Sequence, residues 1–198
     1  MTWIRNDDDS SDSDDDSDTE INVIGSSVYF YCEISDSTIS KLVTELRKLE
    51  IKLRKKAIEL DGYKPRIKLY IRSHGGEVYA GFSAMDHINS MRVPVVTIAD
   101  GICASAATFL LLAGKKRYAT PNTRILIHQI SSGGFWGKYD DLKDDLKHCN
   151  SLMEQLKTLY STKCEIPEKK LSKLMKRDIY LSADECLEFK VIESISCP

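Results

Sequence analysis

The chain has 198 residues, of which 42% are hydrophobic and 29% charged, and this composition excludes a collagen-like, disordered or disulfide-stapled mini-protein. No stretch approaches the roughly 20 apolar residues of a membrane-spanning helix, and the N-terminus lacks the pattern of a secretory signal. We therefore expect one globular domain of ordinary size in the cytoplasm, with no membrane partner.

The net charge of −2 is unevenly distributed along the chain. Nine acidic residues and one arginine in residues 1–20 give that segment a charge of −8, whereas 21 acidic and 27 basic residues give 21–198 a charge of +6. An Asp/Ser run without apolar groups predicts a disordered acidic tail over 1–20, followed by one domain. The basic residues of the domain form no block, so nucleic-acid binding is not expected.

The six cysteines show neither a Cys-x-x-Cys pair nor a Cys/His pair at zinc-ligand spacing. They are Cys32, Cys103, Cys149, Cys164, Cys186 and Cys197. We interpret them as reduced thiols that serve mostly in packing, and we expect no metal site.

Strand-like and helix-like segments alternate through the domain. Short strands are predicted at 22–25 and 28–34, and apolar residues at helical spacing predict a helix from Ser37 to the break at Asp61–Gly62. The later segments are strand 66–71, helix 79–91, strand 95–99, helix 104–113, strand 124–127, helix 139–160, helix 168–175, helix 183–188 and strand 191–195. This alternation predicts right-handed crossovers and an α/β layer architecture.

The helix at 139–160 carries one apolar stripe and charged residues on its other faces. At about 1.5 Å per residue it would be about 33 Å long, nearly the width of a small domain. Such a helix can extend beyond its own core and need a partner, or its stripe can pack entirely within its own subunit.

Three polar residues lie where chemistry is possible, and each also has an ordinary structural interpretation. Ser105 follows a buried strand and lies at the start of a predicted helix, so it can serve as a nucleophile or simply as the N-cap residue of that helix. His128 ends a strand, where α/β sheets bind ligands, and Asp178 suits either a half-buried acceptor for an imidazole or a salt bridge. The glycines of the turn at 75–76 offer backbone amides to an oxyanion, or merely make the turn.

Four motifs in order resemble one family, the proteolytic subunit of the Clp protease (ClpP). They are IRSHGG at 71–76, GICASA at 101–106, PNTRILIHQ at 121–129 and RDIYLSADEC at 177–186. The resemblance runs from about residue 22 to 195 and implies a ClpP/crotonase-like α/β fold of repeated β-β-α units. It also implies a protruding handle helix, with the handle region at about 131–160.

By position, the resemblance makes Ser105 the nucleophile, His128 the general base and later acid, and Asp178 the residue that orients the imidazole. The backbone amides of Gly76 and Ala106 would form the oxyanion hole. It implies a serine endopeptidase that hydrolyses peptide bonds of unfolded proteins, without a metal or organic cofactor.

The resemblance also implies partners. In that family two seven-membered rings join around a chamber, and an AAA+ unfoldase ATPase threads protein substrates inward. The chain itself has no Gly-x-x-x-x-Gly-Lys phosphate loop. Two alternatives stay open: a phage prohead or signal-peptide-peptidase-like protease on the same fold, and a catalytically idle ring subunit. An organelle-encoded member would lie in the plastid stroma.

The sequence departs from the family pattern at several positions. His74 and Ile130 stand where prolines are usual, and Ala106–Ala107 replaces the common Met-Gly after the serine. These departures are expected to change the shape of the substrate pocket without removing an atom of the triad.

Overall fold

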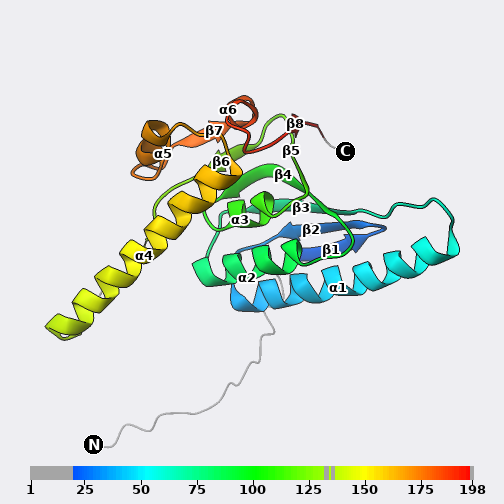
Figure 1. Ribbon diagram of the computed structural model, residues 1–198, viewed down its shortest axis with the longest axis horizontal. Coiled ribbons are helices and arrows are strands. Elements are labelled where there is room, and N and C mark those ends of the chain that lie inside the picture. The colour runs from blue at the N-terminus through cyan, green and yellow to red at the C-terminus, as the bar shows by residue number, and fades with distance from the viewer. Residues whose placement is uncertain (1–19, 132–133, 135–136, 197–198) are drawn as a thin grey trace, which may run out of the picture.

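The computed structural model describes residues 20–131, 134 and 137–196, and an eight-stranded sheet forms its centre (Figure 1). The strands are β1 (Glu20–Ile24), β2 (Ser27–Tyr31), β3 (Ile67–Ser73), β4 (Val95–Ala104), β5 (Lys116–Ala119), β6 (Arg124–Leu126), β7 (Tyr180–Ser182) and β8 (Ser194–Ile195). The helices are α1 (Asp36–Glu59), α2 (Val78–Asn89), α3 (Ala107–Leu112), α4 (Tyr139–Lys163), α5 (Glu168–Leu174) and α6 (Ala183–Glu188).

The sheet is mostly parallel, as the alternation of strands and helices predicts. Its order is β1-β2-β3-β4-β5-β8, and β6 pairs with β4 and β7. Only the β1–β2 and β6–β7 pairs are antiparallel among these strands. The predicted α/β class is therefore confirmed.

The main core forms between the sheet and helices α1, α2 and α3. In β2, Val28 and Phe30 point into this core and are fully buried, whereas Tyr29 and Tyr31 alternate to the other face and are partly exposed. On that other face the two tyrosines pack against a smaller apolar cluster centred on Tyr70. The fold therefore has one fully covered face and one only partly covered face.

Helix α4 projects from the body of the subunit, with its N-terminal end farthest away (Figure 1). Its 25 residues span about 38 Å. The apolar residues of its C-terminal half, Leu152 and Leu156 among them, are buried, whereas Leu146 nearer the N-terminus is 61% exposed. The helix thus extends beyond its own core, and the alternative that its whole stripe packs within the subunit is wrong.

The largest departure from the predicted elements lies around Ser105. Strand β4 continues past the Asp100–Gly101 turn signal to Ala104, and α3 begins only at Ala107. The strand can continue because its second half pairs with β6, a contact that local sequence does not reveal. The prediction also missed β5 and β7, which have four and three residues and therefore give little periodic signal.

Four of the cysteines are buried, which fits a packing role. Burial raises the pKa of the Cys32 and Cys164 thiols to about 11 and that of Cys186 to about 12, so these thiols stay protonated. Cys197 and the acidic tail up to residue 19 lie outside the described residues. No helix in the described part of the chain combines the length and the apolar character needed to span a membrane.

Candidate active site

Ser105 lies in the tight turn between β4 and α3, and its backbone is left-handed with φ +55. A non-glycine residue pays about 1–2 kcal/mol for this conformation, so neighbouring contacts must hold it. The Ser105 N–H donates to the Leu126 carbonyl at 2.9 Å, and the Ser105 carbonyl accepts from Thr108 N at 3.0 Å and from Thr108 Oγ1 at 2.6 Å. The cap residue of α3 is Ala106, so the N-cap interpretation of Ser105 is wrong.

The Thr108 hydroxyl also contacts a helix that comes much later in the chain. Its Oγ1 lies 2.7 Å from the Tyr160 hydroxyl of α4, and both side chains are buried. The Thr108 hydroxyl donates its one proton to the Ser105 carbonyl, so the Tyr160 hydroxyl donates to Thr108. Burial raises the pKa of the Tyr160 phenol, which therefore keeps the proton it donates. Sequence reasoning missed Thr108, and it placed Tyr160 only on the apolar stripe of its helix.

The turn at Gly75–Gly76 fits against Ser105 in a way that only glycine permits. A Cβ on Gly75 would lie 2.7 Å from the Ser105 Cβ, and a Cβ on Gly76 would lie 2.1 Å from the Ile34 carbonyl oxygen. Backbone hydrogen bonds hold this turn to Ile34, which donates to the Gly75 carbonyl and accepts from the Glu77 N–H, both at 2.8 Å.

These hydrogen bonds leave two amides unused at the turn. Within the described residues, neither the Gly76 N–H nor the Ala106 N–H donates to another protein group. The Ala106 nitrogen lies 3.2 Å from the position of a Cβ on Gly75, so the two segments that carry these amides are in contact. Two free amides beside a serine hydroxyl can together bind a negative oxygen.

His128 and Asp178 are brought together by the antiparallel pairing of β6 with β7. Leu126 pairs with Tyr180, and the same register, continued by two residues, places His128 opposite Asp178. His128 Nδ1 lies 3.0 Å from Asp178 Oδ1. The Asp178 side chain is 73% exposed, so the expectation of a half-buried carboxylate is wrong.

Ser105, His128 and Gly76 line one cavity of about 50 Å³. Apolar side chains, including Phe109 and Leu156, form much of its remaining wall. No hydrogen bond joins Ser105 Oγ to His128 in the described part of the chain, and contacts of this kind often tighten only when substrate is bound.

Other candidate groups lie away from this cavity. His74 is exposed at the end of β3 and lines a separate open groove of about 640 Å³ beside Gly76. The described residues contain no group of three His, Cys, Asp or Glu that could hold a metal ion.

Comparisons with known proteins show the family of the chain. The family model described as Clp protease matches residues 19–197. A relative named ATP-dependent Clp protease proteolytic subunit, from Deinococcus radiodurans, is 39% identical over 140 residues, which cover 69% of this chain and 68% of the relative. The family match includes the whole described sheet and the segments that carry Ser105, His128 and Asp178. The chain belongs to the Clp protease family.

Proposed function

We propose that the chain is a serine endopeptidase with Ser105 as nucleophile, His128 as general base and acid, and Asp178 as the residue that orients the imidazole. The observation that carries this proposal is the shared cavity, which Ser105, Gly76 and His128 all line. His128 is also in contact with Asp178. Membership of a protease family supports the same chemistry.

The first half of the proposed reaction forms an acyl-enzyme. Ser105 Oγ bonds to the carbonyl carbon of the scissile peptide while its proton passes to His128 Nε2, because Nδ1 is held by Asp178. The electron pair of the C=O bond moves to oxygen, and the Gly76 and Ala106 amides stabilise that oxyanion. The C–N bond then breaks, and His128 returns the proton to the leaving amine.

The second half hydrolyses the acyl-enzyme. Water attacks the ester carbon while His128 Nε2 accepts a proton, and collapse of the second oxyanion releases the peptide acid and restores the Ser105 hydroxyl. No cofactor is needed for either half. The cavity is small and has a mixed lining, with Val78, Phe109 and Leu156 beside polar groups, so it suits a compact side chain of the substrate next to the scissile bond.

Within the same proposal, two seven-membered rings of this chain form a closed chamber and act with an AAA+ unfoldase ATPase on unfolded proteins. The name of the Deinococcus radiodurans relative supports an ATP-dependent partner. The projecting helix α4, with exposed Leu142 and Leu146, offers an apolar surface for contact between rings. In this arrangement residues 21–198 form the protease domain and 1–20 form the acidic tail, whose last residue, Glu20, already begins β1.

The related Ser-Lys peptidases are a weaker candidate. No lysine is among the described residues that line the cavity, whereas His128 is one of them. The intact set of Ser105, His128 and Asp178 likewise gives no support to an idle ring subunit.

The test is hydrolysis of an unstructured peptide by Ser105→Ala and by a control, Ser172→Ala, which removes an exposed hydroxyl on α5. We expect Ser105→Ala to lower kcat by about 10⁴-fold or more, as loss of a serine nucleophile does. We expect the control to match the parent. A Ser105→Ala enzyme that retains near-parental activity would show that another group is the nucleophile.

A further inference from the structure

The pairing of β3 with β4 is interrupted once, between Ile71 and Ser73. At this bulge, Arg72 alone lies opposite three residues of β4, the segment 100–102. Before the bulge β4 pairs with β5, and after it β4 pairs with β6. Bulges redirect the chain that follows them, and here that chain leads within a few residues to Ser105.

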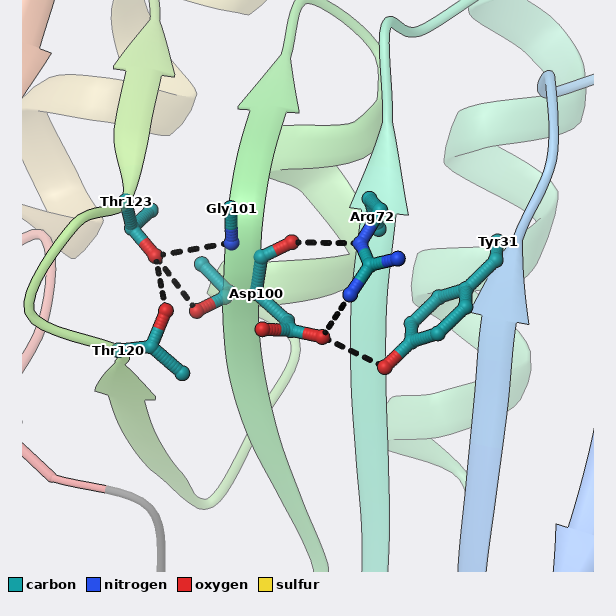
Figure 2. Close-up of polar contacts among 7 residues, drawn as sticks. Tyr31, Arg72, Asp100, Gly101, Thr120 and Thr123 are labelled. Atoms are coloured by element: carbon teal, nitrogen blue, oxygen red, sulfur yellow. Dashed lines mark hydrogen bonds and ion pairs between the residues drawn. The ribbon is translucent and has the colours of Figure 1, made fainter.

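Side chains from neighbouring strands hold one side of the bulge (Figure 2). Arg72 donates from Nε to the Asp100 carbonyl at 3.3 Å and from Nη2 to Asp100 Oδ2 at 2.8 Å. The Tyr31 hydroxyl donates to the same Oδ2 at 2.5 Å, and the Arg72 guanidinium lies over the Tyr31 ring, 4.1 Å from its centroid. Three strands are therefore joined through the Asp100 carboxylate.

Two threonines hold the other side of the bulge (Figure 2). Thr123 Oγ1 accepts from the Gly101 N–H at 3.2 Å and donates to the Ala99 carbonyl at 2.9 Å, and it lies 2.8 Å from Thr120 Oγ1. Side chains thus provide partners for backbone groups that regular strand pairing leaves out at the bulge. These contacts favour one fixed shape of the bulge.

The bulge lies just before both backbone segments of the site. Four residues after Arg72 the chain reaches Gly76, and five residues after Asp100 it reaches Ser105. Gly75 is in direct contact with Ser105, so any shift between the ends of β3 and β4 changes how the two free amides face each other.

We propose that Arg72, through its bonds to Asp100, is a positioning residue that sets the spacing between the Gly76 and Ala106 amides. This inference rests on the proposed function, because the two amides matter only if they bind an oxyanion. Half of the Arg72 side chain is exposed, so its ion pair contributes little to stability. Transition-state geometry is far more sensitive, since a misplacement of about 1 Å can cost about a hundredfold in rate.

The test compares Arg72→Met and Arg72→Lys with a matched control, Lys116→Met. Lys116 forms an exposed ion pair of the same length, 2.8 Å, with Glu193 on the same sheet but away from the bulge. For a short peptide we expect Arg72→Met to lower kcat by about tenfold to a hundredfold, with KM within about twofold of the parent. We expect Arg72→Lys, which can still pair with the Asp100 carboxylate, to recover part of kcat. We expect Lys116→Met to retain the parental kcat.

A second measurement separates positioning from general weakening of the fold. A peptide boronate binds as a tetrahedral adduct on Ser105 and requires the oxyanion site, whereas the cleaved peptide product does not. We expect Arg72→Met to weaken boronate binding by about as much as it lowers kcat and to leave product binding unchanged. The thermal midpoint should shift no more than in Lys116→Met.

Several outcomes would overturn the inference. A parental kcat in Arg72→Met contradicts it, and so does a raised KM with unchanged kcat, which would show that Arg72 binds substrate in the groove beside Gly76. If Arg72→Met does not fold, the same kcat measurement is made on Asp100→Asn, which removes the charge that Arg72 binds. An unchanged kcat in Asp100→Asn would contradict the inference. If peptide hydrolysis by the parent enzyme does not depend on Ser105, the proposed function is itself contradicted. The inference about Arg72 then loses its basis.

Discussion

At the residue scale, the Thr108 hydroxyl connects the nucleophile turn to α4. It donates to the Ser105 carbonyl and lies within hydrogen-bond distance of the buried Tyr160 hydroxyl. Because Thr108 is itself buried, no water replaces it if the hydroxyl is removed. The left-handed backbone of Ser105 would then lose one of the contacts that hold it, and the Tyr160 hydroxyl would lose its acceptor.

We predict that Thr108→Val lowers the free energy of unfolding by about 1–3 kcal/mol and also lowers kcat. Denaturant unfolding and peptide hydrolysis measure the two effects. The control is Thr44→Val, because Thr44 makes a similar bond to the Ser40 carbonyl on the exposed side of α1. Its effect should stay within about 0.5 kcal/mol. Equal losses in the two variants would contradict a special role for Thr108.

At the element scale, Glu50 joins α1 to the segment that leads into β4. Its carboxylate is buried and accepts from the backbone N–H groups of Arg92 and Val93 and from the Arg47 guanidinium. Burial by itself raises the pKa of this carboxyl, but the two amide donors and Arg47 outweigh it and hold the pKa below its ordinary value.

A lowered pKa in the folded state predicts how stability depends on pH. The contribution of the Glu50 charge is fully present above the ordinary glutamate pKa, and it is lost as the pH falls through the lowered folded-state pKa. We predict that Glu50→Gln destabilises the protein by about 1–2 kcal/mol at pH 7 and that the difference from the parent shrinks below about pH 4.

Thermal unfolding of the two proteins between pH 7 and pH 3 measures this difference. Glu45→Gln is the control, because Glu45 lies on the same helix and its carboxylate, among the residues that the structure describes, pairs with Lys48 at the partly exposed surface. A difference for Glu50→Gln that stays constant over this range would show that the Glu50 charge is not involved.

The sequence predicts an element well where its apolar residues repeat over many turns. It predicts an element less well where contacts with distant segments decide where the element ends. Helices α1 and α4 follow from apolar spacing over more than 20 residues. The continuation of β4 to Ala104 depends on pairing with β6, and the exposure of Asp178 depends on how the loop before β7 lies. Local sequence contains neither fact.

The candidate site shows the same division. Motif order and family resemblance pointed to Ser105, His128 and Asp178, and the structure places the first two on one cavity and the last two in contact. The contacts that hold the site join Thr108 to the Ser105 carbonyl and Arg72 to Asp100. Thr108 and Asp100 lie in none of the four motifs, and the motif that contains Arg72 does not indicate its partner on β4. The Arg72–Asp100 contact could not be found without the register of the sheet, and the Thr108–Ser105 bond depends on the shape of the turn before α3.

At the scale of the whole molecule, α4 is the element least explained by a single subunit. Its exposed apolar residues include Leu146, which is 61% exposed beyond the part of the helix that packs on the core. Exposed leucines on a projecting helix suit burial against another copy. The acidic tail up to residue 19 lies outside the described residues, and its disorder stays a prediction.

We predict that Leu146→Asp shifts the assembly to smaller species while the subunit remains folded, because the change places a charge in an apolar interface. Native mass spectrometry measures the assembly, and circular dichroism measures the folding. The control is Lys147→Asp, which changes an exposed polar residue next to it. An unchanged parental assembly in Leu146→Asp would exclude this part of α4 from the interface.

The central claim is that the His128–Asp178 pair activates Ser105, and covalent labelling tests it most directly. The measurement is the mass of the intact subunit after reaction with a fluorophosphonate, followed by peptide mapping of the label. We predict one label per subunit, located on Ser105, and labelling slowed by at least about a thousandfold in His128→Ala. An enzyme that hydrolyses peptides while Ser105 remains unlabelled, or that labels equally fast without His128, would contradict the account.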